Sequence, residues 1–286
     1  MKIDLKLLHQ GKVRDIYDAG NNQLLMVASD RISAFDCIFA EKISGKGRVL
    51  NDISNFWFEK TSHIIKNHTT KTTVSDILGD NLVSELSGKA IVVQKLTPLP
   101  IEAIVRGYII GSGWKSYKNS GEICGVNLPK GLELAEKLPE AIYTPSSKAA
   151  VGGHDENISF AKTIDLIGRD LATQVRDTSL EIYNFATEFA IKKGIIIADT
   201  KFEFGLNENK ELVLMDEVLT PDSSRFWDAR LYKKGVSPQS FDKQILRDYL
   251  ETLDWNKSPP VPKLPSEIIQ KTADKYTEVK NILFKS

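Results

Sequence analysis

The segment Ile195–Trp227 constrains the fold of this chain most, because it places charges inside an apolar stretch. Its first part, IIIADTKFEFG, predicts a strand in which charged and aromatic side chains alternate. The charged side chains then share one face of that strand: Asp199, Lys201 and Glu203. Charges on a strand with apolar neighbours are costly unless they are paired or bind a metal.

A second strand follows at Leu212–Val218. A hairpin loop across Asn207–Lys210, or a two-residue loop at Glu208–Asn209, would place Asp216 on the same face as Glu203. Two carboxylates beside a lysine suit Mg²⁺ and a polyphosphate, since Mg²⁺ prefers one or two carboxylates together with phosphate oxygens. An exposed charged hairpin with a salt bridge is the structural alternative.

Composition excludes several classes of function. The 286 residues include 38 Lys and Arg against 38 Asp and Glu, so no net field favours nucleic acid or an acidic membrane. Cys37 and Cys124 are too few for a disulfide scaffold, which indicates a reducing cytoplasm. Neither an apolar leader nor a run of roughly 18 apolar residues is present. We therefore expect a cytoplasmic protein without membrane or nucleic-acid partners.

The periodicity of the chain predicts two lobes. In the first part, the patterns predict these elements: strands at Lys12–Tyr17, Gln23–Ala28 and Ala90–Leu96, and a helix at Leu50–Lys66. Pro98 and Pro100 then interrupt the chain, so we expect a strand-rich lobe at 1–97 and a larger lobe at 98–286.

The larger lobe is predicted to alternate between strand and helix. Its expected elements are a strand at Ile101–Arg106, a helix from about Gly113, a long polar loop at Gly121–Asp155, helix over Ser159–Lys193, and a last helix from Ser266. The sequence contains no P-loop or GxGxxG motif, so any use of ATP does not depend on a P-loop. His63 and His68 are too poorly spaced to share a helix face and are expected at the surface.

Two blocks that contain glycine resemble anion sites. Arg106 ends a strand, and Gly111-Ser112-Gly113 precedes a helix whose N-terminus would favour a negative charge. Ser112 as a helix cap, with Arg106 in a structural ion pair, is the alternative. The block Gly11–Tyr17 offers Lys12 and Arg14 on one strand face, but a lone Gly-Lys is a weak signal and an ordinary hairpin is the favoured interpretation.

Two further blocks are rich in hydroxyl and charged side chains. The loop Thr144–Asn157 carries His154 and Asp155 beside two glycines, and long loops in compact domains are often functional. Asp155 as the cap of the next helix is the alternative. The block Ser29–Asp36, SDRISAFD, accompanies the Gly-Lys block near the N-terminus.

Six blocks together resemble the SAICAR synthetase family (phosphoribosylaminoimidazole-succinocarboxamide synthases). In that family's order they are GKVRDIY, SDRISAFD, LPIEAIVRGYIIGSGW, TPSSKAAVGGHDENIS, ADTKFEFG and MDEVLTPDSSRFWD, between residues 11 and 228. The resemblance implies an α+β fold with a kinase-like N-terminal lobe, an ATP-grasp-like C-terminal lobe and ATP between them. It also implies a ligase of purine biosynthesis that converts ATP, the imidazole carboxylate CAIR and L-aspartate to ADP, phosphate and the succinocarboxamide SAICAR.

The resemblance further assigns roles to residues. For ATP these are Lys12, Arg14, Gln94, Leu96, Glu203 and Asp216, the last two also holding Mg²⁺. For the CAIR phosphate they are Arg106, Ser112 and Arg225. Asp199 and Lys201 would lie at the reacting carboxylate. The remaining substrate candidates, for the aspartate and imidazole ends, are Ser33, Asp36, His154 and Asp155.

Three other functions share parts of this pattern. Another ATP-dependent carboxylate–amine ligase would keep the magnesium carboxylates without the phosphate-binding arginines. A small-molecule kinase would release a stable phosphorylated product and need no amine. A silent nucleotide-binding module is expected to have lost Lys201, Glu203 or Asp216, and all three are present. The resemblance leaves a homo-oligomer open.

Overall fold

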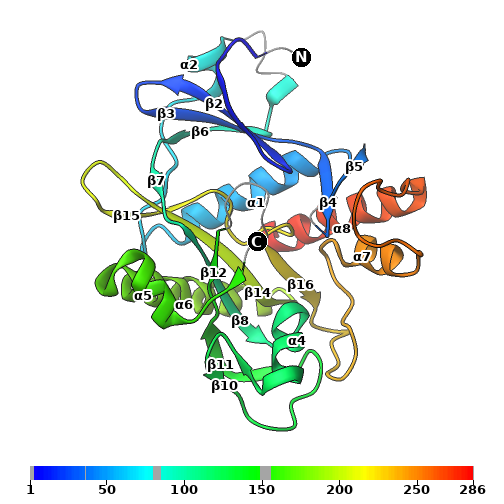
Figure 1. The fold of residues 1–286 in the computed structure, drawn as a ribbon. Coiled ribbons are helices and arrows are strands. Elements are labelled where there is room, and N and C mark those ends of the chain that lie inside the picture. The colour runs from blue at the N-terminus through cyan, green and yellow to red at the C-terminus, as the bar shows by residue number, and fades with distance from the viewer. Residues whose placement is uncertain (1–2, 36, 80–84, 149–155, 286) are drawn as a thin grey trace.

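A four-stranded antiparallel sheet, formed mostly by strands near the N-terminus, lies at the top of Figure 1. The computed structural model describes residues 3–35, 37–79, 85–148 and 156–285. The strands of this small sheet are, in spatial order, β1 (Leu7–Gln10), β2 (Arg14–Gly20), β3 (Gln23–Ala28) and β6 (Ala90–Gln94). The sequence predicts all of them except β1, whose residues are exposed and carry no burial pattern.

A hairpin and two helices follow within the first third of the chain. They are β4 (Arg31–Ala34), β5 (Cys37–Lys42), α1 (Lys46–Lys60) and α2 (Val74–Leu78). In α1, Leu50, Ile53 and Trp57 are buried at helical spacing and form its core face. This helix starts four residues before the predicted Leu50 and ends six before Lys66.

The larger sheet contains eight strands around the central strands β8 and β14. Its strands are β7 (Thr97–Pro98), β8 (Ile101–Tyr108), β11 (Lys137–Tyr143), β12 (Ser146–Ser147), β13 (Glu156–Asn157), β14 (Ile195–Leu206), β15 (Leu212–Met215) and β16 (Ser224–Asp228). A separate pair joins β9 (Glu122–Ile123) to β10 (Val126–Asn127). The prediction of a polar loop over Gly121–Asp155 was therefore wrong in its described part, because β11 pairs with β8 and adds to the sheet.

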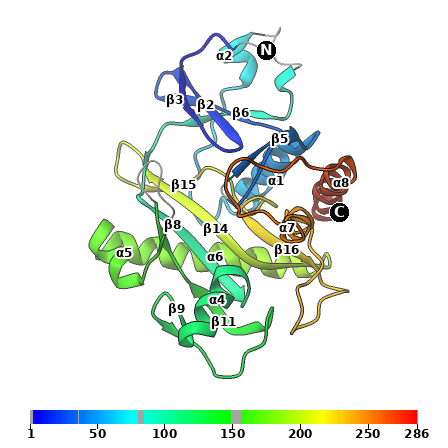
Figure 2. The ribbon, with the colours of Figure 1, turned by 45° about the vertical axis from the view of Figure 1, so that its right-hand side comes forward.

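Helices packed on this sheet or beside it complete the α+β class that the sequence predicts. They are α4 (Gly111–Ser120), α5 (Phe160–Ile167), α6 (Arg169–Ile191), α7 (Gln244–Glu251) and α8 (Ser266–Phe284). The helix expected over Ser159–Lys193 is two helices, because Gly168 takes a φ of 83° that interrupts the helical backbone. The last helix begins at Ser266 as predicted and lies against α1 (Figure 2).

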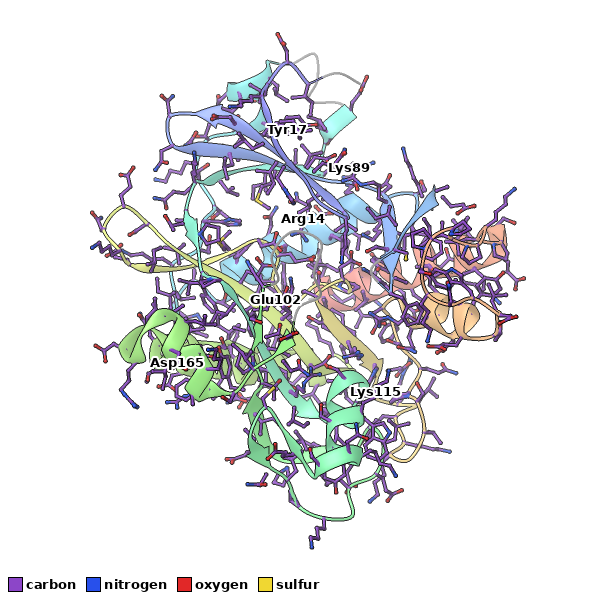
Figure 3. All side chains as sticks on the ribbon, viewed as in Figure 1. Arg14, Tyr17, Lys89, Glu102, Lys115 and Asp165 are labelled. Atoms are coloured by element: carbon purple, nitrogen blue, oxygen red, sulfur yellow. The ribbon has the colours of Figure 1, made fainter. Side chains whose placement is uncertain are left out.

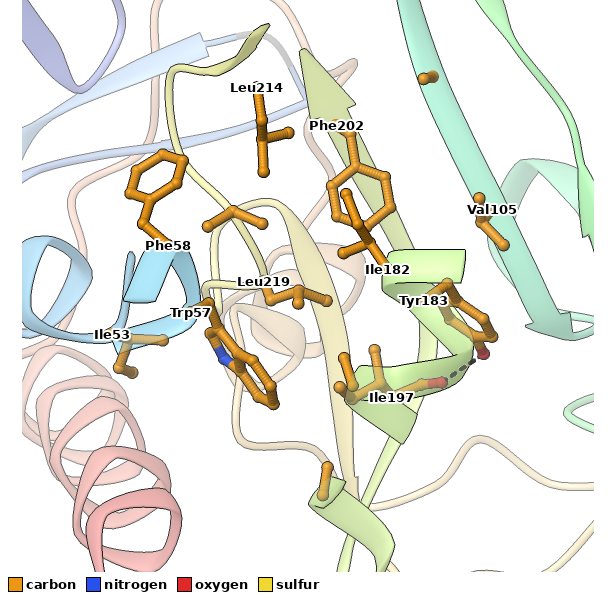
Figure 4. Packing of buried hydrophobic residues seen from close by; sticks show 14 of the residues in the cluster. Ile53, Trp57, Phe58, Val105, Ile182, Tyr183, Ile197, Phe202, Leu214 and Leu219 are labelled. Atoms are coloured by element: carbon orange, nitrogen blue, oxygen red, sulfur yellow. Dashed lines mark hydrogen bonds between the residues drawn. The ribbon is translucent and has the colours of Figure 1, made fainter. Parts of the chain in front are cut away.

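One hydrophobic core joins elements from both ends of the chain. Trp57 of α1, Phe202 of β14 and Tyr276 of α8 are all fully buried in it. Figure 4 shows Trp57 and Phe202 on facing sides of this core, with Tyr183 of α6 donating a hydrogen bond of 2.6 Å to the Ile197 carbonyl. The small sheet ends at Gln94, close to the boundary that the sequence predicts between residues 97 and 98. However, α1 precedes this boundary in the chain and packs in the main core with the larger sheet, so the division into two lobes stays a prediction.

Candidate active site

The antiparallel pair β8–β14 collects charged side chains on one face of the larger sheet. Asp199 lies opposite Arg106, and Lys201 lies opposite Ile104. Because side chains alternate along a strand, residues two apart share this face. The face carries Glu102, Ile104 and Arg106 from β8 and Asp199, Lys201 and Glu203 from β14. The opposite face of β14 is aromatic and buried, as the sequence predicts.

Lys201 is held between two carboxylates in what we call the central cluster, formed by Glu102, Lys148, Lys201 and Glu203. Its ammonium lies 2.8 Å from Glu102 Oε1 and 2.6 Å from Glu203 Oε1. Lys148 Nζ approaches the other oxygen of Glu203 at 2.6 Å. Burial alone lowers the pKa of Lys201, but the charges of Glu203 and Glu102 outweigh it and raise that pKa. The lysine therefore stays cationic and can stabilise negative charge.

A second group, the Arg14 cluster, joins the small sheet to the loop after β15. The Arg14 guanidinium pairs with Asp216 and approaches Glu217 Oε1 at 2.5 Å. Burial raises the pKa of Asp216, but the charges of Arg14 and Lys201 outweigh it and lower that pKa. Figure 3 shows Arg14 beneath the small sheet and Glu102 below it on the larger sheet, so this cluster and the central cluster are neighbours.

The predicted hairpin register is wrong by one residue. Glu203 lies opposite Met215, because the connection Asn207–Glu211 has five residues rather than four or two. In a regular strand this register would turn Asp216 to the aromatic face. The strand ends at Met215, however, and Asp216 has a φ of 65°, which redirects its side chain. Asp216 therefore still lies close enough for its negative charge to raise the pKa of Lys201. This is the association with the lysine that the sequence predicts.

A third group, the arginine pocket, lies at the other end of the shared face. Oδ2 of Asp199 accepts a hydrogen bond of 2.7 Å from Arg106 and another from Arg225. Arg106 also donates to Ser112 Oγ at 3.1 Å and to Thr144 Oγ1 at 3.0 Å. The structure therefore brings together Arg106, Ser112 and Arg225, which the sequence separates by up to 119 positions (225 minus 106).

The N-terminus of α4 completes this pocket. Its N-cap residue is Ile110, and no side chain caps the helix, which leaves its first backbone N–H groups available to an anion. Gly111 has a φ of 58°, and a Cβ atom there would collide with the Arg225 guanidinium. Glycine is thus required for the helix end to approach the arginine so closely. Two guanidiniums, a hydroxyl and the N-terminus of a helix thus present hydrogen-bond donors to one region of the site.

Comparison with known proteins identifies the family to which this chain belongs. Residues 7–262 match the family model for SAICAR synthetase. The phosphoribosylaminoimidazole-succinocarboxamide synthase of Neisseria meningitidis serogroup B is 55% identical, over 99% of this chain and 98% of that protein. The chain belongs to the SAICAR synthetase family. It is an ATP-dependent ligase of purine biosynthesis.

Solved structures agree with the sequence match. The SAICAR synthase of Saccharomyces cerevisiae complexed with SAICAR has a TM-score of 0.91 and 42% identity, covering 100% of this chain and 97% of the yeast chain. A type-2 SAICAR synthetase in complex with ADP has a TM-score of 0.72 and 25% identity, covering 96% and 97%. The fold is thus that of SAICAR synthetases over the whole described chain.

The structure describes four of the other predicted site residues: Lys12, Ser33, Gln94 and Leu96. Gln94 is the last residue of β6, where its N–H donates to the His68 carbonyl at 2.7 Å, and Leu96 lies between β6 and β7. Lys12 lies in the turn that precedes β2. Ser33 is buried in the β4–β5 hairpin, and within the described chain no hydrogen bond joins it to the three clusters. Asp36, His154 and Asp155 lie outside the described residues.

His68 is buried, so the prediction that it lies at the surface was wrong. Its ring packs against Phe58 with 5.1 Å between ring centroids. Burial lowers its pKa to about 4, which keeps the imidazole neutral near pH 7. His63 is exposed, as the sequence predicts.

Sequence reasoning assigned no role to three residues of the clusters: Glu102, Lys148 and Glu217. Glu102 could have been found, since its even spacing from Arg106 puts both on one strand face. Glu217 is adjacent to Asp216 but binds the other nitrogen of Arg14, which requires the turn after Met215. Lys148 follows β12, an element that the polar-loop prediction omitted.

A buried ion network supports the loop at residues 216–223, which connects β15 to β16. Asp222 lies at 2.7 Å from Lys46 and 3.3 Å from Lys243, and it accepts a hydrogen bond of 2.5 Å from Tyr276. The side chain of Lys46 is 0% exposed and that of Asp222 is 3% exposed. This loop begins with the carboxylates of the Arg14 cluster and leads to Arg225, so the network fixes both ends of the site.

We predict that Asp222→Asn destabilises the protein by about 3 kcal/mol at pH 7, because it leaves Lys46 buried without its counter-ion. Burial raises the pKa of Asp222, but Lys243 and Lys46 outweigh it and hold that pKa below its unfolded value. Its contribution is therefore present above the unfolded pKa and declines as the pH falls below about 5. Urea unfolding of both proteins at pH 7 and at pH 4 measures this difference.

Asp165→Asn is the matched control, since Asp165 is 69% exposed and lies 3.9 Å from Lys162. It should change stability little at either pH. Equal stability of wild type and Asp222→Asn at pH 7, or a difference that grows in acid, would contradict the role of the network.

Proposed function

We propose that this enzyme joins CAIR and L-aspartate to form SAICAR, with conversion of ATP to ADP and phosphate. The observation that carries the proposal is the order of the three groups along one sheet face. The Arg14 cluster adjoins Lys201 and its carboxylates, and the arginine pocket lies two residues further along β14. A substrate with an anionic group at one end and a reactive carboxylate at the other would span this row.

We assign the nucleotide to the end with the Arg14 cluster. Lys12 and Arg14 would meet the phosphates, and the backbone between Gln94 and Leu96 would read the adenine. The family relative solved in complex with ADP supports nucleotide use. The position of Arg14 between the small sheet and the loop carboxylates supports this orientation.

We assign a magnesium ion to Glu203 and Asp216. Within the described chain no three acidic, histidine or cysteine side chains form a metal-binding group, so the protein alone supplies an incomplete ligand set. That fits Mg²⁺, which is bound by one or two carboxylates together with substrate phosphates and water. Among the ion pairs of the described residues, the carboxylates Glu102, Glu203, Asp216 and Glu217 contact Arg14, Lys148 and Lys201. Bound there, the ion would neutralise charge on the phosphates.

The arginine pocket would hold the phosphate of CAIR, which does not react. Arg106 and Arg225 offer planar forks suited to a phosphate, and Ser112 with the α4 N-terminus adds further donors. Asp199 bridges the two guanidiniums, and this would orient them while it lies on the same face as Lys201. We therefore assign Asp199 the catalytic role that the resemblance implies and a second role in orienting the two arginines.

The chemistry then takes two steps. A carboxylate oxygen of CAIR attacks the terminal phosphorus of ATP, and the bond to ADP breaks to leave an acyl phosphate. The aspartate amine attacks the acyl carbon, loses a proton, and phosphate departs with that oxygen. Lys201 would stabilise the charge that develops at the carboxylate, since its ammonium is fixed by Glu102 and Glu203.

The reducing cytoplasm remains our assignment of compartment. Cys37 and Cys124 are free thiols, as expected there. In the described part of the chain, no helix combines the length and apolar character that crossing a membrane requires.

Substrate dependence of ADP release tests the proposed function. ADP should accumulate at the full rate only when ATP, CAIR and L-aspartate are all present. Full ADP release without the amine would favour a small-molecule kinase. Full release with another carboxylate in place of CAIR would favour a different carboxylate–amine ligase.

Glu203→Gln and Asp216→Asn should each lower turnover by about 10³-fold, because each removes a proposed magnesium ligand. Circular dichroism should stay native, and the magnesium concentration for half-maximal rate should rise. Glu211→Gln on the same hairpin is the control, since Glu211 is exposed and its side chain contacts Lys66 and Asn207 at the surface. Wild-type magnesium dependence in both variants would exclude this metal site.

Arg106→Ala and Arg225→Ala should raise the KM for CAIR by about 10- to 150-fold, the equivalent of about 1.5–3 kcal/mol for a charge-assisted hydrogen bond. The KM for ATP should change little. Arg→Lys should recover little, because a point charge cannot reproduce the bidentate fork. If both variants instead weaken ATP and leave CAIR unchanged, the arginines belong to the nucleotide site.

A further inference from the structure

Arg31, in the block SDRISAFD, has no role in the proposed chemistry, although it contacts the Gly-Lys block. Arg31 at the start of β4 is 22% exposed at its side chain and points back to the turn before β2. We call this turn, residues 11–15, the Gly-Lys turn. It carries Lys12 and Arg14, the two cations that we assign to the nucleotide phosphates.

Arg31 makes four contacts with the Gly-Lys turn. Its two terminal nitrogens donate to the two carboxylate oxygens of Asp15 at 3.0 and 2.7 Å. The same guanidinium donates to the Gly11 carbonyl at 3.1 Å and to the Lys12 carbonyl at 3.3 Å. A planar guanidinium with fixed donors can hold a carboxylate and two carbonyls at once, and an ammonium cannot.

Ser29 holds the middle of the same turn. Its backbone N–H and its hydroxyl both donate to the Val13 carbonyl at 2.8 Å. Within the turn, Gly11 N donates to the Arg14 carbonyl at 2.7 Å. Every carbonyl from Gly11 to Arg14 is therefore paired, which fixes the backbone on which the two cations are mounted.

Asp30, between these two residues, binds a different element. It accepts a hydrogen bond of 2.9 Å from Gly47 N at the start of α1 and lies 2.8 Å from Lys89 Nζ. The segment 29–31 thus ties the Gly-Lys turn to the first turn of α1. Because α1 packs in the main hydrophobic core, these contacts connect the Gly-Lys turn to that core.

We propose that Arg31 is a positioning residue for nucleotide binding, which fixes the Gly-Lys turn so that Lys12 and Arg14 meet the phosphates. This inference rests on the proposed function for the identity of the nucleotide. Arg31 acts through the turn and contacts no reacting atom. A turn that is already ordered loses less conformational entropy when the nucleotide binds.

Kinetics and direct binding test the proposal in the full chain. Arg31→Ala should raise the KM for ATP by about 10-fold, with kcat within about threefold and the KM for CAIR unchanged. Calorimetry with ADP and magnesium, without the other substrates, should show a matching loss of affinity. Arg31→Lys should recover little, because one ammonium cannot replace four directed contacts.

Two further variants separate positioning from general stability. Asp15→Asn removes one end of the bidentate pair and should reproduce part of the ATP effect, and its effect should not add fully to that of Arg31→Ala. Arg48→Ala is the control guanidinium, since Arg48 is 61% exposed and lies 3.9 Å from Asp52. It should leave both KM values unchanged.

Equal increases in the KM for ATP and CAIR, or full recovery of ATP binding by Arg31→Lys, would overturn the proposal. So would fully additive effects of Arg31→Ala and Asp15→Asn. If the wild type fails to release ADP with CAIR and L-aspartate, the proposed function fails by itself. The calorimetric loss of ADP affinity in Arg31→Ala still decides the role of the turn.

Discussion

The pairing of β8 with β14 is the constraint on which the rest of the site depends. Register sets Asp199 against Arg106 and Lys201 against Ile104, so both strands present their charges to one side. The other side of β14 is buried in the main core, where Phe202 is 0% exposed. A shift of one residue would bury the charges and expose the aromatic rings, so the core itself enforces the register of the active face.

Ion pairs between neighbouring side chains offset the cost of placing these charges on one face when no substrate is bound. Lys201 lies between Glu102 and Glu203, and Asp199 lies between two arginines, so each charge has a partner within hydrogen-bonding distance. Buried charges that lose a partner are costly. In our proposal Asp199 therefore stays paired with Arg106 and Arg225 and orients them toward the CAIR phosphate.

Whether a feature of the fold or of the site could be predicted depends on how far apart in the sequence its interacting residues lie. Alternation along β14 and the glycines at the start of α4 are local signals. From them the sequence predicts the charged and the aromatic face of β14, and a common site for Arg106 and Ser112. The register of the hairpin could not be predicted, because the left-handed backbone of Asp216 compensates for a one-residue shift. Pairs such as Lys46 with Asp222 join residues 176 positions apart, and no local pattern reports them.

The central claim is that the row of clusters brings the terminal phosphate of ATP to the carboxylate of CAIR, whose own phosphate is held at the far end. Transfer of an isotope tests this most directly. CAIR labelled with ¹⁸O in both carboxylate oxygens is converted with ATP and L-aspartate, and the released inorganic phosphate is analysed by mass spectrometry. We predict one ¹⁸O atom per phosphate, since the acyl phosphate passes that oxygen on when the amine displaces it. Phosphate without label would contradict activation of the CAIR carboxylate and with it our assignment of the site.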